Sequence, residues 1–228
     1  MNHKISIKSA DDKNLPIYVS EPKGIRKGAI VIIQEIFGVN NHIKSVANKF
    51  AEEGFIVWSP EIYHRLGEEI QLGYDENSVK EGKKLKDKSG WELPVMDILS
   101  CVANLKIENS NVSLLGFCYG GSLAWKSACQ GYGISSSVCF YGSQITDFLK
   151  LNNKCPVQIH LGEKDISINL KQQQNILNYS KKSKQLVELH NYKEADHGFF
   201  CEERKSFHKN SAEIAFSRSV DFISKFQQ

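Results

Sequence analysis

Short hydrophobic runs recur along the chain and are separated by amphipathic segments. The runs at 28–33 and 55–58 are almost wholly apolar, with many β-branched residues, which is typical of strands buried on both faces of a parallel sheet. Two further runs flank the polar turn 11–14 and predict an N-terminal pair of strands. The predicted strands are Lys4–Ile7, Leu15–Val19, Gly28–Ile33, Phe55–Trp58, Val112–Leu115, Ser137–Tyr141, Val157–Leu161 and Leu186–Leu189.

Segments with apolar residues at every third or fourth position predict helices between these strands. The predicted helices are His42–Glu53, Glu76–Lys86, Leu93–Leu105, Ser122–Ala128, Leu170–Tyr179 and Ser211–Phe226, and 60–73 is predicted to be a long loop. Because strands and helices alternate, we predict an α/β fold with a mostly parallel central sheet and helices on both faces. No repeat or linker divides the sequence, so we expect residues 1–228 to form one domain.

The composition narrows the classes of function. The 228 residues carry a formal net charge of +3 with acids and bases interspersed, so we do not expect nucleic-acid binding. No apolar run approaches the roughly 18 residues that span a bilayer, and residues 1–6 lack the apolar core of a signal peptide. We therefore expect a cytoplasmic protein without a membrane partner, either a monomer or a small homo-oligomer. The six cysteines are scattered with no C-x-x-C pair, which predicts free thiols and no metal or cofactor site.

The sequence Gly-Phe-Cys-Tyr-Gly-Gly at 116–121 stands between a predicted strand and a predicted helix. It resembles the nucleophile elbow of α/β-hydrolases, Gly-x-nucleophile-x-Gly, with Cys118 at the nucleophile position. The glycines permit close approach of neighbouring backbone, and the elbow holds its nucleophile in a strained conformation. Free N–H groups at the start of the helix favour a thiolate. The alternative is that Cys118 is a core residue, as cysteines in apolar surroundings often are.

Polar residues that follow two later strands supply an acid and a base. Asp165 follows the predicted strand at 157–161, and His197 follows the one at 186–189. In a parallel sheet such positions lie at the edge where ligands bind. The order cysteine, aspartate, histidine is the order of nucleophile, acid and base in α/β-hydrolases. We expect His197 to take or share the thiol proton and Asp165 to orient the imidazole.

Two other acids compete with Asp165 for this role. Asp196 is adjacent to His197, but neighbouring residues of an extended segment point in opposite directions, so Asp196 is badly placed to hold the ring. Asp147 is the second alternative.

The segment after the strand at 28–33 carries a further signal. Glu35 is flanked by apolar residues, and a buried carboxylate needs a partner. On one interpretation that partner is a salt bridge or a helix cap; on the other, Glu35 faces the Cys118 thiol and governs its ionisation. Because α/β-hydrolases place an oxyanion-hole donor in this loop, we assign the N–H groups of Ile36 and Tyr119 to that role.

The chain resembles the dienelactone hydrolase family (carboxymethylenebutenolidases) in motifs that occur in order over nearly the whole sequence. The matching segments are QEIFGVN at 34–40, SPEIY at 59–63, GFCYGG at 116–121, YG at 141–142, GEKD at 162–165 and HGF at 197–199. The resemblance implies a single α/β-hydrolase domain with a triad of Cys118, Asp165 and His197, and with Glu35 near the thiol. It further implies hydrolysis of an ester or enol-lactone bond in a small molecule, without a cofactor.

One position departs from the family's pattern. Members that act on dienelactone are thought to hold the substrate carboxylate with two arginines, and Arg65 looks like the first. The second is expected shortly after the catalytic histidine, where this chain has Cys201; Arg204 is close by but out of register. Loss of one charge-assisted hydrogen bond costs about 1.5–3 kcal/mol, which weakens the case for dienelactone itself.

The residues expected to line the pocket are Tyr63, Arg65, Phe37, Trp91, Tyr141 and Phe199. Each is equally consistent with an ordinary core or surface position. Two other functions stay open: a general carboxylesterase or thioesterase with the same triad, and a non-catalytic thiol sensor with Cys201 as its resolving cysteine. The fold alone does not separate them.

Overall fold

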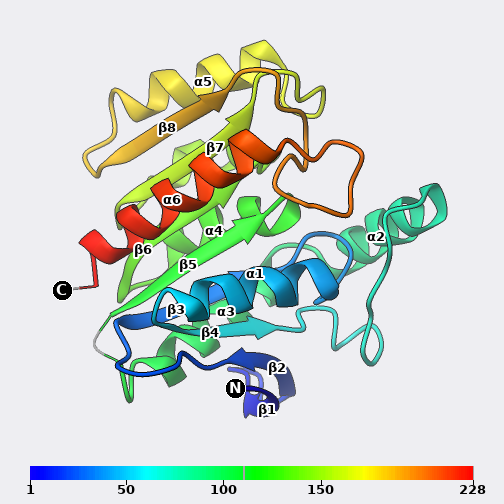
Figure 1. Cartoon of the computed structure of the whole chain (residues 1–228), viewed down its shortest axis with the longest axis vertical. Helices are drawn as coiled ribbons and strands as arrows, with labels where there is room; N and C mark the ends of the chain where they lie inside the picture. The colour runs from blue at the N-terminus through cyan, green and yellow to red at the C-terminus, as the bar shows by residue number, and fades with distance from the viewer. Residues whose placement is uncertain (110, 228) are drawn as a thin grey trace.

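Eight strands of the described chain form one sheet (Figure 1). The computed structural model describes residues 1–109 and 111–227. The strands are β1 (Asn2–Lys8), β2 (Asn14–Ser20), β3 (Gly28–Ile33), β4 (Phe55–Pro60), β5 (Val112–Phe117), β6 (Ile134–Phe140), β7 (Val157–Gly162) and β8 (Val187–Tyr192). Their order is β1-β2-β4-β3-β5-β6-β7-β8; β2 pairs antiparallel with β1 and β4, and the other pairs are parallel. The predicted mostly parallel α/β sheet is confirmed.

Helices cover both faces of this sheet. Figure 1 shows α1 and α6 on one face and α3 and α4 on the other. The helices are α1 (Asn41–Glu52), α2 (Glu76–Ser89), α3 (Glu92–Leu105), α4 (Tyr119–Gln130), α5 (Leu170–Ser180) and α6 (Lys209–Lys225), with a 3₁₀ helix η1 (Ile145–Leu151). Local chemistry sets where two of them begin. The Asn40 side chain accepts a hydrogen bond from Ile43 N–H at the start of α1, and Asp75 caps α2 in the same way.

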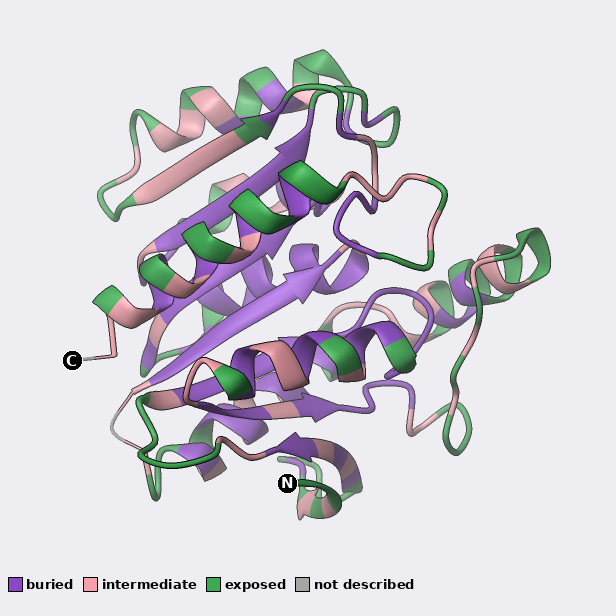
Figure 2. Ribbon diagram, in the orientation of Figure 1, coloured by how far each residue is buried: buried purple, intermediate pink, exposed green. Residues whose placement is uncertain are grey.

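The central strand β5 lies between β3 and β6 and is buried along its whole length. Figure 2 shows that burial is concentrated in the middle strands, whereas α5 and α6 keep exposed faces. The chain leaves β3 toward β4 on one side and leaves β5 toward β6 on the other. The carboxyl ends of β3 and β5 therefore form the topological switch point, where open α/β sheets bind ligands. Glu35 follows β3 and Cys118 follows β5 at this point.

Several predicted elements differ from the structure by a few residues at their ends, and η1 is an additional element. Strand β8 extends beyond 186–189 through polar residues to Tyr192, because it is an edge strand that pairs only with β7 and is only partly buried. The η1 helix is absent from the prediction, since 3₁₀ helices are short and lack a strong hydrophobic period. The loop predicted at 60–73 carries no helix, and Gln71 joins it to Gly38 by an isolated β-bridge.

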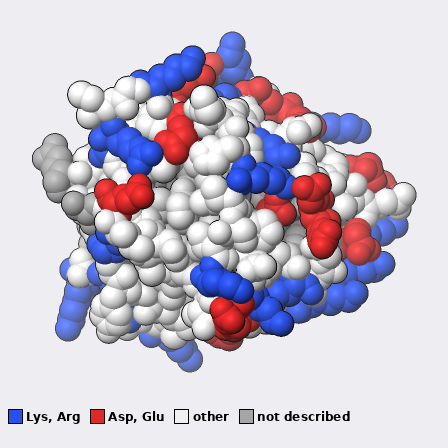
Figure 3. Space-filling view, turned by 90° about the horizontal axis from the view of Figure 1, so that it is seen from below, with Lys and Arg blue, Asp and Glu red and all other residues white. Residues whose placement is uncertain are grey.

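Acidic and basic side chains are interspersed on the face drawn in Figure 3, rather than gathered by sign. This mixture agrees with the small net charge of +3. None of the helices in the described residues has both the length and the apolar character needed to cross a membrane.

Candidate active site

Cys118 occupies a strained turn between β5 and α4. Its backbone φ of 54° and ψ of −114° lie in a region that L-residues seldom adopt, at a cost on the order of 1–3 kcal/mol. Its N–H donates a hydrogen bond of 3.0 Å to the carbonyl of Phe140 at the end of β6. The strain lifts the side chain out of the sheet, and Cys118 lines a cavity at the switch point.

Two glycines make this turn possible. A Cβ at Gly116 would lie 2.0 Å from the carbonyl oxygen of Gly120, inside the turn itself. A Cβ at Gly120 would lie 2.4 Å from the carbonyl oxygens of both Ile33 and Gln34. The start of α4 therefore packs directly against the end of β3, which brings the Cys118 turn and the Glu35 loop together.

His197 and Asp165 meet next to Cys118. The His197 Nδ1 atom lies 2.8 Å from Asp165 Oδ2, and the other carboxylate oxygen accepts the N–H of Ser167 at 2.8 Å. Asp165 is 3% exposed, so solvent competes little for this bond. Asp196, in contrast, accepts the backbone N–H of His197 at 2.6 Å and leaves the ring to Asp165. Asp147, the other alternative acid, lies on η1 and lines the same cavity as Cys118.

The charge state of His197 is set by competing effects. Burial alone lowers the pKa of an imidazole, but the charge of Cys118 and the hydrogen bonds with Asp165 and Cys118 outweigh it and raise the pKa of His197 to about 10. The imidazole of His197 is therefore protonated at neutral pH beside Cys118.

Glu35 is fully buried and has two partners. One carboxylate oxygen lies 3.3 Å from Arg204 Nη1, and the other accepts the Tyr74 hydroxyl at 3.2 Å. Burial and the neighbouring Glu35 charge raise the pKa of the Tyr74 hydroxyl, so it stays protonated and donates. These contacts correspond to the salt-bridge interpretation of Glu35. The sequence analysis did not identify Tyr74, and it named Arg204 only as out of register, because neither residue lies in a motif.

A cavity of about 450 Å³ opens above Cys118. Five of the residues expected at the site line it, namely Cys118, His197, Ile36, Tyr119 and Phe37. The sequence analysis missed other lining residues, namely Val79, Lys83 and Lys86 of α2, together with Ser143, Gln144, Ser167 and Gln172. No local pattern in α2 indicates that one of its faces turns toward the site.

The assigned oxyanion donors have free backbone groups. Ile36 and Tyr119 both line the cavity with Cys118. The Tyr119 N–H belongs to the first residue of α4, where no intrahelical acceptor is available. Within the described chain, neither this N–H nor that of Ile36 has a hydrogen-bond partner.

Most of the other aromatic residues expected in the pocket lie behind its wall. Tyr141 is fully buried, and its ring centroid lies 5.1 Å from that of His197. Phe199 packs edge-on against Tyr141, with centroids 5.5 Å apart. Tyr63 and Trp91 both pack against the Tyr119 ring, at 6.4 and 5.1 Å between centroids. These side chains support the site and are outside the set of described residues that line the cavity.

Arg65 lies elsewhere. Its Nη2 is 3.0 Å from Asp97 Oδ1 and 2.9 Å from Asp11 Oδ1, and its Nη1 also contacts Asp97. Asp97 is completely buried and requires a cation, which the sequence did not reveal because the two residues lie in different elements. Among the described residues, Arg65 is not part of the lining of the Cys118 cavity. The cavity's arginine is instead Arg204.

The strand order, the strained turn after β5, and the acid and base after β7 and β8 define the class of protein as an α/β-hydrolase. Comparison with known families gives the same class in finer detail. The model of the "Dienelactone hydrolase family" matches residues 15–227. The chain therefore belongs to the dienelactone hydrolase family and is a hydrolase of this type.

Individual relatives match over nearly their full length. The chain is 29% identical to a candidate carboxymethylenebutenolidase of Synechocystis sp., covering 94% of each sequence. It is 28% identical to the carboxymethylenebutenolidase of Pseudomonas putida, covering 98% of this chain and 96% of that one. A crystal structure of a candidate dienelactone hydrolase from Klebsiella pneumoniae superimposes with a TM-score of 0.87 at 24% identity, covering 99% of both chains. This last likeness shows the shared fold.

Proposed function

We propose that this protein hydrolyses ester or enol-lactone bonds through a covalent intermediate on Cys118. The observation that carries the proposal is the position of His197, hydrogen-bonded to Asp165 at 2.8 Å and electrostatically coupled to Cys118. The strained backbone of Cys118 and the unpartnered N–H groups beside it support the same role.

The reaction proceeds by acyl transfer to water. The Cys118 thiolate attacks the carbonyl carbon, and the oxyanion accepts hydrogen bonds from the N–H groups of Ile36 and Tyr119. The carbon–oxygen bond to the leaving group breaks, and protonated His197 supplies its proton to the leaving alcohol or enol. His197 then removes a proton from water, whose oxygen attacks the thioester and releases the acid and the thiolate. Asp165 keeps the imidazole oriented throughout.

Glu35 acts as a positioning residue in this proposal. Its carboxylate holds Arg204 at the wall of the cavity and itself is fixed by Tyr74. Because Glu35 is fully buried, it binds Arg204 on the side that faces the protein interior. The remaining N–H groups of the guanidinium are then available to a ligand.

The charges around the cavity favour an anionic substrate. Arg204, Lys83 and Lys86 line it, and Asp147 is the single acid among the described residues that do so. The name of the Pseudomonas putida relative, carboxymethylenebutenolidase, denotes a lactone that carries a carboxyl group. We propose that Arg204 takes the place of the arginine expected at Cys201, so that esters and lactones bearing a carboxylate bind best.

The alternatives make different demands on the site. A general carboxylesterase or thioesterase would use the same triad without a preference for anionic substrates. A thiol sensor would need an accessible resolving cysteine, but Cys201 is fully buried and none of the described cysteines forms a disulfide. The buried state of Cys201 favours the hydrolase over the sensor.

The test is turnover of p-nitrophenyl acetate and of a dienelactone by the wild type and by Cys118→Ala. We expect the wild type to hydrolyse at least one substrate and the variant to lose at least about 10³-fold in kcat, because the nucleophile is gone. Cys129→Ala is the matched control, since it removes a different buried thiol of α4 and should keep full turnover. Activity that survives in Cys118→Ala would contradict the proposal.

A further inference from the structure

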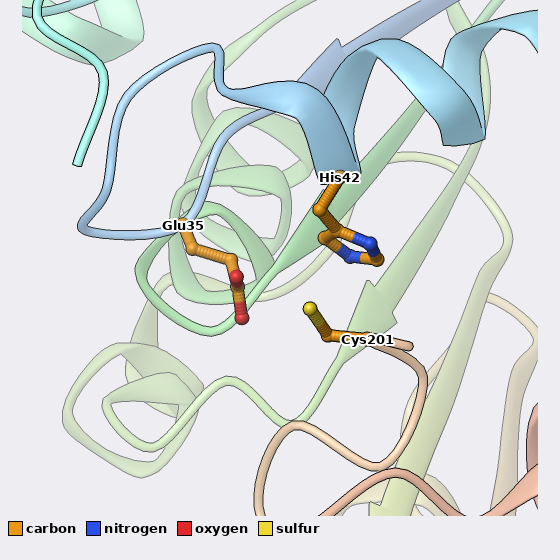
Figure 4. A group of neighbouring side chains, drawn as sticks. All are labelled: Glu35, His42 and Cys201. Atoms are coloured by element: carbon orange, nitrogen blue, oxygen red, sulfur yellow. The ribbon is translucent and has the colours of Figure 1, made fainter. Parts of the chain in front are cut away.

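Three side chains that could bind a metal ion point toward one another (Figure 4). Glu35 follows β3, His42 lies in the first turn of α1, and Cys201 lies in the loop after β8. One ligand atom from each residue lies within 4.8 Å of the other two, and all three residues are buried. We propose that Glu35, His42 and Cys201 form a binding site for a divalent metal ion, with Zn²⁺ as the preferred ion.

The types of ligand fit this ion. Carboxylate, imidazole and thiolate are the three side-chain groups that bind Zn²⁺, and a set of three leaves one position for water. Softer ions would require more sulfur, and Ca²⁺ or Mg²⁺ would require more oxygen.

Without a metal ion, the burial of the His42 side chain has no explanation. Its Nε2 atom is buried and has no hydrogen-bond partner among the described residues. A buried nitrogen of this kind costs free energy unless something pairs with it. An unprotonated imidazole nitrogen can donate an electron pair to a metal. Figure 4 shows the imidazole beside Glu35 and Cys201 rather than turned away.

The charges balance when the ion binds. The ion replaces the proton of the Cys201 thiol: the S–H bond breaks, a metal–sulfur bond forms, and the proton leaves to water. The two positive charges of Zn²⁺ are then offset by the thiolate and the Glu35 carboxylate. Because Arg204 now pairs with the Glu35 carboxylate, the occupied site has no net charge only when Arg204 turns away from Glu35, which avoids the large penalty of an unbalanced buried charge.

The geometry requires only a small contraction. Tetrahedral bonds of about 2.0–2.3 Å place neighbouring ligand atoms roughly 3.3–3.8 Å apart. The three ligand atoms now lie within 4.8 Å of one another. Side-chain movements on the order of 1 Å would bring them to the tetrahedral distances. Access is available from one side, because Tyr74 and Arg204, which cover Glu35, also line an open groove of about 1000 Å³.

A metal ion bound at this site would change the position of Arg204 in the Cys118 cavity. The ion and Arg204 compete for the Glu35 carboxylate, and Arg204 lines the cavity of Cys118. This consequence for turnover rests on the proposed function, whereas metal binding itself does not. No local sequence pattern indicates this site, since its residues are scattered at positions 35, 42 and 201.

The experiment measures metal affinity in full-length protein with the catalytic thiol removed. Cys118→Ala is titrated with Zn²⁺ against a chromophoric chelator, and Co²⁺ is used as a spectroscopic probe. We expect one tightly bound Zn²⁺ per chain and a thiolate-to-cobalt charge-transfer band. Adding Cys201→Ser or His42→Gln should weaken binding by more than about 100-fold and, for Cys201→Ser, abolish the band. Adding Cys129→Ala should change neither result. Far-UV circular dichroism verifies that each variant is folded.

Three outcomes would overturn the proposal. One is failure of Cys118→Ala to bind Zn²⁺ stoichiometrically. The second is unchanged affinity in folded Cys201→Ser and His42→Gln. The third is binding by the wild type that disappears with Cys118→Ala, which would place the ion at the catalytic thiol. Because the readout is affinity and a spectrum, a failure of the proposed ester hydrolysis leaves this test intact.

Discussion

At the scale of single residues, the proposed mechanism depends on the charge of His197 beside Cys118. Desolvation opposes a cation at this position, but the neighbouring thiol and Asp165 outweigh it and raise the pKa of His197 to about 10. The imidazole therefore remains protonated through neutral pH and loses its proton only as the pH rises through that value. A protonated imidazole is also the form that donates a proton to the leaving group.

Arg204 gives the residue-scale prediction. Replacing it in Arg204→Gln removes a cation that lines the cavity, so KM for a carboxylate-bearing ester should rise about 10-fold or more, equivalent to about 1.5–3 kcal/mol. KM for a matched neutral ester should change little. The measurement is steady-state kinetics on the ester pair.

The neighbouring Lys205→Gln serves as the control for Arg204, because Lys205 is exposed and lies outside the cavity lining among the described residues. Equal losses on both esters in Arg204→Gln would show that Arg204 supports the structure without recognising charge.

Local sequence patterns predict where Cys118, Asp165 and His197 lie in the fold, whereas their catalytic roles stay predictions. Cys118 stands in a glycine-framed turn, and Asp165 and His197 follow predicted strands, so topology alone brings them to one edge of the sheet. Such patterns do not find Tyr74 or Arg204, whose roles depend on long-range contacts with the buried Glu35 carboxylate.

Arg65 illustrates the same limit from the opposite direction. The family resemblance predicts a ligand contact for Arg65, yet the buried Asp97 of α3 binds it. Arg65 contacts Asp97 because a buried carboxylate needs a cationic partner. No local sequence pattern shows that Asp97 is buried or that Arg65 lies near it.

At the scale of elements, the elbow depends on the absence of a side chain at Gly120. In Gly120→Ala the new Cβ would lie 2.4 Å from two backbone carbonyl oxygens, so α4 must move away from the end of β3. We predict a loss of about 1–3 kcal/mol in the free energy of unfolding, with a larger proportional loss of turnover. Urea unfolding and steady-state kinetics measure the two effects.

Gly73→Ala is the matched control for the elbow, because its added Cβ would meet nothing closer than 3.6 Å. It should keep the stability of the wild type within about 0.5 kcal/mol. Unchanged turnover in Gly120→Ala would show that the turn tolerates displacement and does not position the thiol.

The elements themselves were largely predictable. Buried strands such as β3 and β4 are continuous apolar runs, and α1 has a clear apolar face, so their periods leave little ambiguity. The predicted strand at 186–189 ends three residues before β8 does. The polar residues at the end of β8 belong to the strand because they pair with β7, and hydrophobicity does not indicate them.

At the scale of the whole molecule, a buried charge network joins segments far apart in the sequence. Asp97 of α3 accepts the hydroxyl of Ser9, which follows β1, and pairs with Arg65, which follows β4. His64 Nε2 lies 3.1 Å from the same carboxylate. The network therefore fastens the N-terminal strands to the rest of the molecule.

We predict that Asp97→Ala lowers the free energy of unfolding by about 1.5–3 kcal/mol at pH 7, since it removes the buried partner of Arg65 and leaves that side chain only its contact with Asp11. Burial raises the pKa of Asp97, but hydrogen bonds from His64, Arg65 and Ser9 outweigh it and lower the pKa below 3.8. Because the folded-state pKa is depressed, this stabilisation is present above pH 3.8 and is lost as the pH falls through the folded-state value.

Urea unfolding at pH 7 and near pH 3 tests this prediction, since the difference between wild type and Asp97→Ala should shrink in acid. Asp87→Ala is the control, because that side chain is 74% exposed and its removal should cost no more than about 0.5 kcal/mol. A pH-independent difference would mean that the side chain's volume, not its charge, is what stabilises the fold.

The most direct test of the account is to detect the acyl group on Cys118 during turnover. The wild type is mixed with p-nitrophenyl acetate, quenched in acid within the first turnovers, and analysed by intact and peptide mass spectrometry. The account predicts one added acetyl group on the peptide that contains Cys118, and none in Cys118→Ala. Release of p-nitrophenol with no acetyl group on Cys118, or acetylation of another residue in both proteins, would contradict it.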